Sequence, residues 1–445
     1  MERQIIEKLH IWKDSPRRKP LLLTGARQVG KTWAMKEFGK LYYENVAYLP
    51  IIDSETFRYI FKPVSEPLEI LNRVQAELKT TITAGTTLII FDEIQDIPDA
   101  INCLKFFKEK APEYHLIAAG STLGVMLSQQ KSFPVGMVNF LNLHPMSFIE
   151  YLNANGENRI SEMINVNQLM NGSPFEEKLN AYVKEYFYVG GMPECVSAFI
   201  SSHDYVETQE IQKDILNTYI RDFSKYTTAN FAAKLRLVWD VIPAQLAKEN
   251  KKFMYGVIKN GARAKEYETQ IEWLRDSSLA YKVSKVTKPG YPLKSYEDAS
   301  AFKIFIHDIG ILSAMVEIDS GVLLRGSELF TEAKGTMTEQ YVHQQLVAAR
   351  EKGIYFWSNE NGRTEIDFLI QDQEGNIVPV EVKSGFNLRA KSLKAYQQKY
   401  NPPYAIRTSP ASFKVDKVNK IIDVPLYALE ILPEVLKVAK SLIEE

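Results

Sequence analysis

The chain has 445 residues, more than one hydrophobic core usually serves, so two or three domains are expected. Hydrophobic residues make up 45% and charged residues 24%, and the formal net charge of -1 excludes a strongly basic nucleic-acid-binding composition. Only two cysteines occur, which argues against a disulfide framework and favours a reducing compartment. Without an apolar signal segment or a long apolar run, the chain is predicted to be cytoplasmic and to have no membrane partner.

The first part of the chain is expected to form an α/β domain over residues 1–160. After an amphipathic N-terminal helix, short apolar runs alternate with helical stretches, and these runs read LLLTG, NVAYLPI, TLIIFDE, YHLIAAG and VNFLNL. Strands that alternate with helices predict a parallel sheet with helices on both faces. The polar stretch from Asn153 to Ser173 is interpreted as an insertion or a boundary.

The first of these strands leads into a glycine-containing loop. Residues 25–32, GARQVGKT, fulfil the pattern G-x-x-x-x-G-K-[ST] between an apolar strand and a helix. Such a loop turns successive N–H groups toward phosphates, and the following helix N-terminus adds partial positive charge. Lys31 would bridge the β- and γ-phosphates of ATP, and the Thr32 hydroxyl would ligate Mg²⁺. The predicted nucleotide contacts are Gly25, Ala26, Arg27, Gln28, Val29, Gly30, Lys31, Thr32 and Trp33.

A second motif, LIIFDE, follows later in the same region. Four apolar residues end in Asp92 and Glu93, as a buried strand would present them at its carboxyl edge. Asp92 would hold Mg²⁺ through its water shell, and Glu93 would act as general base on the attacking water. Ser121, after the next strand, would contact the γ-phosphate or that water, and a solvated turn is the alternative interpretation.

Residues 174–300 are predicted to be mainly helical and to end in a winged-helix-like module. A turn at Lys259 to Gly261, a helix and a strand-like segment follow one another there. Arg263 and Lys265 would contact DNA phosphates if the module binds DNA. Packing between domains is the other interpretation, and both stay open.

Residues 301–445 are predicted to form a mixed α/β domain. Glu381 and Lys383 are two apart on one strand and therefore face the same side. Asp367 on the preceding strand and Glu339 on an earlier helix would join them. Asp367 and Glu381 would then hold Mg²⁺ while Lys383 orients or deprotonates water, although such charged strand residues are also commonly just solvated. A later helix would present a basic face made of Arg389, Lys391, Lys394 and Lys399.

Several sequence segments, spread over nearly the whole chain, resemble the corresponding segments of one protein family. They are TGARQVGKT, IIFDEIQDIP, LHPMSFIEYL, YVGGMPECV, KGTMTEQYVHQQL and EIDFLI with PVEVKSG. The chain is thereby similar to bacterial and archaeal AAA+-type P-loop ATPases that carry a C-terminal domain of unknown function (DUF4143). The last domain also resembles a PD-(D/E)xK, or restriction-endonuclease-like, core. Met137 stands where family members often carry an arginine finger, which implies weak ATP turnover, and Arg221 is a candidate replacement or a surface ion-pair residue.

The leading interpretation is a Mg²⁺-dependent ATP-binding protein that hydrolyses ATP slowly and uses it as a conformational switch, with DNA as a candidate partner. One alternative is an ATP-regulated, metal-dependent nuclease. The other is a non-enzymatic scaffold that keeps its nucleotide bound. The protein partner and the oligomeric state are left open by the sequence.

Overall fold

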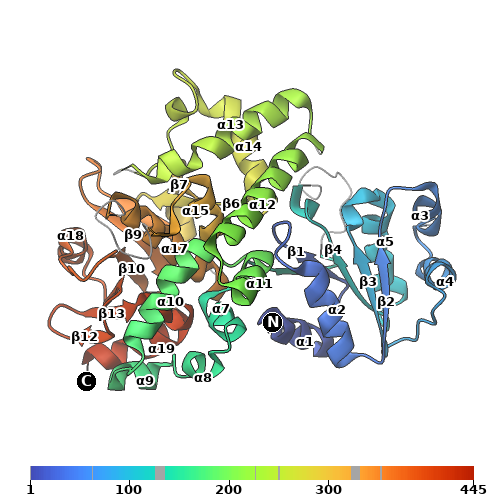
Figure 1. Cartoon of the computed structure of the whole chain (residues 1–445), viewed down its shortest axis with the longest axis horizontal. Helices are drawn as coiled ribbons and strands as arrows, with labels where there is room; N and C mark the ends of the chain where they lie inside the picture. The colour runs from blue at the N-terminus through green and yellow to red at the C-terminus, as the bar shows by residue number, and fades with distance from the viewer. Residues whose placement is uncertain are drawn as a thin grey trace. The chain divides into compact units, whose positions relative to one another are not determined.

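The computed structural model divides the chain into two compact units (Figure 1). The N-terminal unit contains residues 2–144 and 272–279, and the C-terminal unit contains residues 145–271 and 280–445. The expected three-domain division is a finer one and stays a prediction. The structure describes residues 2–62, 64–125, 136–225, 227–248, 251–321, 331–350 and 353–444.

The N-terminal unit is built on a five-stranded sheet in which every pair of neighbouring strands is parallel. In spatial order its strands are β2 (Asn45–Pro50), β3 (Thr87–Asp92), β4 (His115–Ala119), β1 (Leu21–Thr24) and β5 (Asn139–Asn142). All six residues of β3 are buried, as expected for a strand covered on both faces. The predicted parallel α/β fold is therefore confirmed. Its main helices are α1 (Ile5–Asp14), α2 (Lys31–Tyr42), α3 (Glu55–Ile60), α4 (Pro67–Leu78) and α5 (Pro98–Lys110).

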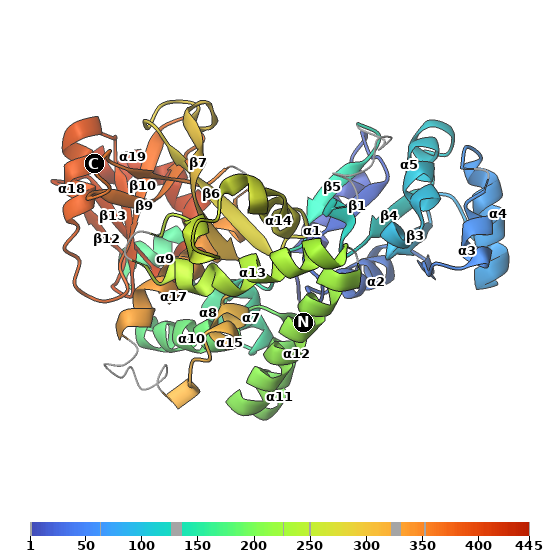
Figure 2. The same cartoon turned by 90° about the horizontal axis from the view of Figure 1, so that it is seen from above.

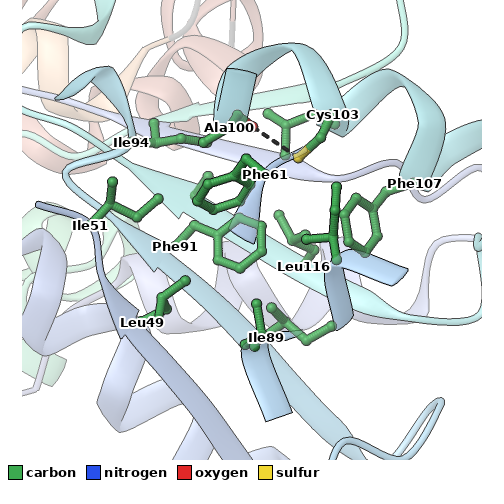
Figure 3. Close-up of a cluster of buried hydrophobic side chains, with 14 of the residues drawn as sticks. Leu49, Ile51, Phe61, Ile89, Phe91, Ile94, Ala100, Cys103, Phe107 and Leu116 are labelled. Atoms are coloured by element: carbon green, nitrogen blue, oxygen red, sulfur yellow. Dashed lines mark hydrogen bonds between the residues drawn. The ribbon is translucent and has the colours of Figure 1, made fainter. Parts of the chain in front are cut away.

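The core of this unit packs on one face of the sheet (Figure 3). The ring of Phe91 on β3 meets Phe61 edge to face at 5.3 Å and Phe107 of α5 at 6.2 Å. The Leu88 side chain, of opposite alternation, lies near Gly39 of α2, where an added Cβ would be 3.3 Å from it. Strand β3 is thereby held between two helical layers, and its carboxyl end has a fixed position.

The C-terminal unit contains an eight-stranded mixed sheet. In spatial order its strands are β12 (Lys414–Asp416), β13 (Ile421–Pro425), β11 (Ala405–Ser409), β10 (Ile377–Val382), β9 (Glu365–Gln371), β8 (Tyr355–Ser358), β6 (Ala280–Val286) and β7 (Glu297–Ile306). The β6–β7 hairpin, whose strands lie side by side in both views, joins this sheet through parallel pairing of β6 with β8 (Figure 2). The expected boundary at residue 300 thus falls inside β7.

Helices make up much of the rest of the C-terminal unit, as expected for its first part. The longer ones are α10 (Glu176–Val189), α11 (Pro193–Ser202), α12 (Tyr205–Lys225), α13 (Ala229–Leu246), α14 (Ala264–Asp276), α17 (Thr331–Ala349), α18 (Lys391–Tyr400) and α19 (Leu432–Glu444). The shorter ones include α7 (Phe148–Ala154), α8 (Asn158–Glu162), α9 (Val166–Asn171) and α15 (Ile309–Met315). The last residues of α14 are grouped with the N-terminal unit. Among the described helices, none has the length and apolar character needed to cross a membrane.

Candidate functional site

The loop between β1 and α2 depends on glycine at two positions. Gly25 has φ +138°, and a Cβ added there would lie 2.2 Å from the Leu143 carbonyl oxygen. Gly30 caps α2 with φ +93° in the left-handed region. Gln28 also has a positive φ of 66°. The loop therefore curls tightly in front of the α2 N-terminus, which is the geometry that presents N–H groups to an anion.

Lys31 lies inside this loop. Its Nζ donates to the carbonyl oxygens of Gly25 and Ala26, both at 2.8 Å, and the side chain is buried. Burial lowers the pKa of Lys31 to about 8, while the carboxylates of Glu93 and Asp92 act to raise it. The loop thus holds a poorly hydrated ammonium group ready to pair with phosphate.

Thr32 and Asp92 meet at the carboxyl edge of the sheet. The Thr32 hydroxyl donates to Asp92 Oδ2 at 2.5 Å, and the Tyr48 hydroxyl donates to the same oxygen at 3.1 Å. A hydroxyl and a carboxylate together are the oxygen donors that Mg²⁺ prefers, so these residues fit the predicted ion. Tyr48 did not emerge from the sequence, because only the pairing of β2 with β3 brings it beside Asp92.

Glu93 is held by two neighbours. It has φ +54°, and its Oε2 accepts from Gln95 Nε2 at 2.7 Å and lies 3.4 Å from both the amide nitrogen and the hydroxyl of Ser121. A Cβ on Gly120 would come within 1.9 Å of Gln95 Oε1. The structure therefore brings Ser121 to the carboxylate predicted as general base, and adds Gln95, which no pattern in the sequence singled out.

Arg3 ties the loop to the segment that follows β5. Its guanidinium donates to the carbonyl oxygen of Val29 at 2.9 Å and to that of His144 at 2.7 Å, and the side chain is buried. This residue lies far from the loop in sequence, and no sequence signal pointed to it. It restrains the backbone between the two loop glycines.

The other predicted residues of the nucleotide site are more open. Arg27 is partly exposed, and Trp33, in the first turn of α2, is 40% exposed. Met137 is partly exposed in the segment before β5. Arg221 is exposed on α12 of the C-terminal unit.

The predicted C-terminal residues also come together. The β9–β10 pairing places Asp367 beside Glu381, and Asp367 Oδ2 accepts from the Val382 amide at 2.8 Å. Lys383 Nζ donates to Glu381 Oε1 at 2.8 Å. Burial raises the pKa of Glu381 to about 7, helped by the nearby Asp367 and opposed by Lys383.

Two lysines that the sequence did not indicate complete this region. Lys303 on β7 and Lys251 both pair with Glu339, the predicted fourth metal ligand. Within the described ranges, no group of three or more His, Cys, Asp or Glu side chains is arranged to hold a metal ion. The second Mg²⁺ site at Asp367 and Glu381 therefore stays a prediction.

The predicted DNA-contacting side chains are accessible. Arg263 and Lys265 are exposed at the start of α14, and the basic residues along α18 are exposed as well. Whether they contact DNA stays a prediction.

Comparisons with known families agree with this geometry. An AAA domain matches residues 17–152, and a domain of unknown function (DUF4143) matches residues 334–427. The sheet, the loop and this match define a P-loop ATPase domain of the AAA type. The chain joins it to a DUF4143 domain, and another domain of unknown function (DUF8612) matches residues 180–321 between them. No curated protein matches the chain.

Solved structures show more distant similarity. A Walker-type ATPase of Pyrococcus abyssi is 14% identical, with 71% of this chain and 95% of that chain covered and a TM-score of 0.43. Cdc6p of Pyrobaculum aerophilum is 12% identical, with coverages of 73% and 93% and a TM-score of 0.26. The Aeropyrum pernix Orc1 protein, solved in complex with DNA, is 12% identical, with coverages of 71% and 90% and a TM-score of 0.30.

Proposed function

We propose that the N-terminal unit binds ATP with Mg²⁺ at residues 25–33 and hydrolyses it slowly. The observation that carries this proposal is the 2.5 Å contact of the Thr32 hydroxyl with Asp92, directly after a loop that buries Lys31. A threonine and a carboxylate from distant segments converge where an anion-binding helix begins. Such convergence is what phosphoryl transfer from a nucleotide requires.

Each residue has a role in the proposed reaction. The Lys31 ammonium would leave the Gly25 and Ala26 carbonyls to pair with the β- and γ-phosphates. Glu93 would accept a proton from the attacking water, with its carboxylate oriented by Gln95 and Ser121. Mg²⁺, held by Thr32 and Asp92, would supply charge neutralisation of the phosphates.

We further propose that the nucleotide acts as a conformational switch. Met137 in place of an arginine supports slow turnover, since a charge that would stabilise the transferring phosphoryl group is missing at this position. A slow enzyme spends long periods in one nucleotide state. DNA is the candidate partner, and the exposed Arg263 and Lys265 are where its phosphates would bind.

The test combines nucleotide content with single-turnover hydrolysis. We expect purified wild-type protein to hold ADP, and Glu93→Gln to bind ATP with unchanged affinity but hydrolyse it at least about 100-fold more slowly. Lys31→Ala should bind neither nucleotide, whereas Lys40→Ala, an exposed lysine on the same helix, should behave as wild type. If the wild-type protein instead holds ATP tightly and never hydrolyses it, the protein is a non-enzymatic scaffold. Wild-type affinity in Lys31→Ala would disprove the site.

A further inference from the structure

The C-terminal unit brings seven charged side chains together, and we call this group the charge cluster. They come from α17, from β7, β9 and β10, and from residues adjoining α13 and β10. Its members are Lys251, Lys303, Glu339, Glu365, Asp367, Glu381 and Lys383.

Lys303 is the centre of the charge cluster. Its side chain has 0% exposure, and its Nζ lies 2.9 Å from Glu339 Oε1 and 2.6 Å from Glu365 Oε1. The same ammonium is 4.9 Å from the ring centroid of Phe356. A buried cation therefore bridges two carboxylates from different elements, as a metal ion would do.

The remaining carboxylates are also compensated. Lys251 contacts the second oxygen of Glu339, so both oxygens of this buried side chain face ammonium groups. Lys383 pairs with Glu381 at 2.8 Å, and Asp367 accepts the Val382 amide at 2.8 Å. Glu381 Oε2 is the carboxylate oxygen of the described cluster that is buried without a hydrogen-bond partner. Both oxygens of Glu339, and one oxygen each of Glu365, Asp367 and Glu381, are therefore already bound to an ammonium or amide group with which a divalent ion would have to compete.

We infer that Lys303 and Lys251 take the place of a divalent cation, so that the charge cluster joins the strands to α17 as an internal ion-pair lock and binds no metal. A divalent ion shared by Glu339 and Glu365 would have to displace the fully buried ammonium of Lys303, which would then lie desolvated beside a second positive charge. The inference concerns the C-terminal unit and does not depend on the proposed ATPase.

The first test counts bound Mn²⁺ by electron paramagnetic resonance. The full chain carries Thr32→Ala and Asp92→Asn, which silence the predicted Mg²⁺ site of the N-terminal unit. We expect no stoichiometric Mn²⁺ at millimolar concentration. One equivalent of Mn²⁺ that disappears when Asp367→Asn and Glu381→Gln are added would overturn the inference.

The second test measures thermal unfolding. Lys303→Met leaves Glu339 and Glu365 buried without their cation and should lower the Tm by roughly 10 °C. Adding Glu339→Gln and Glu365→Gln removes the uncompensated charge and should restore part of that loss. Lys394→Met, at an exposed position of α18, is the control and should leave the Tm unchanged.

Two outcomes would overturn the lock. One is a Lys303→Met protein with the Tm of the control. The other is a Tm that the two glutamine substitutions fail to raise, because that result would assign Lys303 a packing role alone. If Lys303→Met yields no folded protein, the Tm of Lys251→Met is measured in its place. The Lys251 side chain is 17% exposed, so the protein should tolerate its loss with a smaller decrease in Tm. An unchanged Tm in Lys251→Met would then contradict the lock.

Discussion

At the scale of single residues, the state of Lys31 decides how the loop meets a nucleotide. Two backbone carbonyls hold its ammonium, but they do not replace the hydration that burial removes. The pKa is consequently lowered to about 8, close to neutral pH. Phosphates would restore the ordinary preference for the charged form, so proton uptake is coupled to binding.

This coupling predicts a pH-dependent affinity. Above pH 8 the free protein has lost the Lys31 proton and must regain it on binding ATP, so the Kd should rise by up to about tenfold per pH unit. Below pH 7 the lysine is already charged, and this contribution should vanish. Titration calorimetry in buffers of different ionisation enthalpy measures both Kd and proton uptake. A Kd that stays flat to pH 9.5 with no proton uptake would refute the prediction.

Gln95 is a second residue whose role lies in its contacts. It donates to Glu93 while Gly120 leaves room for its amide oxygen. A side chain at position 120 would push the amide away without removing it. Gln95 therefore acts as a positioning residue for the proposed base.

We expect Gln95→Leu and Gly120→Ala each to lower kcat by about tenfold, since Glu93 loses its orientation. Nucleotide affinity should change little, because the side-chain hydrogen bonds described for Gln95 go to Glu93 and Asp96 and not to the phosphate loop. Single-turnover hydrolysis and fluorescent-nucleotide binding separate the two effects. Weaker binding with an unchanged kcat would assign these residues to the nucleotide pocket instead.

At the scale of elements, the segment YVGGMPE (residues 188–194) packs against the segment HDIGIL (residues 307–312). Asp308 caps α15 and accepts from the amides of Gly191 at 2.7 Å and Ile311 at 3.1 Å. Gln344 of α17 also donates to it at 3.0 Å. Burial raises the pKa of Asp308, and these donors counteract that effect. The residues that make these segments distinctive therefore serve packing of α10, α15 and α17.

Close backbone contact at Gly310 provides a stability test. A Cβ there would lie 2.5 Å from the Val189 carbonyl oxygen and 2.7 Å from the Gly190 amide, so backbone must move. Gly310→Ala should lower the free energy of unfolding by about 2–3 kcal/mol. Gly335→Ala is the matched control, because no described atom beyond its chain neighbours and the adjacent backbone of α17 lies within 4 Å of its added Cβ, and α17 should gain about 0.5–1 kcal/mol. Chemical denaturation of both variants measures the difference, and equal stabilities would contradict the packing role.

At the scale of the whole molecule, each unit has its own sheet and its own buried core. A ligand that binds to one unit stabilises the folded form of that unit only. The chain leaves the N-terminal unit after residue 144 and returns to it for residues 272–279. Calorimetry can therefore test whether the two units unfold separately.

We expect two thermal transitions. ADP with Mg²⁺ at about 100 times its Kd should stabilise the N-terminal unit by about 2.7 kcal/mol and raise its transition by roughly 5–10 °C. The other transition should stay in place, and Lys31→Ala should abolish the shift. A single transition that moves with nucleotide would show that the two units unfold together.

The sequence alone predicted the parts of the site that are local. The loop, its glycines and Lys31 are contiguous, and a buried strand necessarily delivers Asp92 and Glu93 to its carboxyl edge. The parallel sheet followed from alternating apolar and helical segments. The approach of Asp367 to Glu381 likewise followed from two adjacent strands.

Tertiary structure decided which distant side chains complete these groups. Tyr48 reaches Asp92 only because β2 lies beside β3, and Arg3 bonds a loop residue that follows it by 26 positions in the sequence. Lys303 meets Glu339 because β7 joins the C-terminal sheet, the same pairing that places residue 300 inside a strand. From the sequence alone, a lysine in a strand is expected to face solvent. Only the burial of Lys303 in the tertiary structure makes it the partner of two carboxylates. Periodicity reports local structure, whereas the identity of a buried charge's partner is set by contacts between segments far apart in the chain.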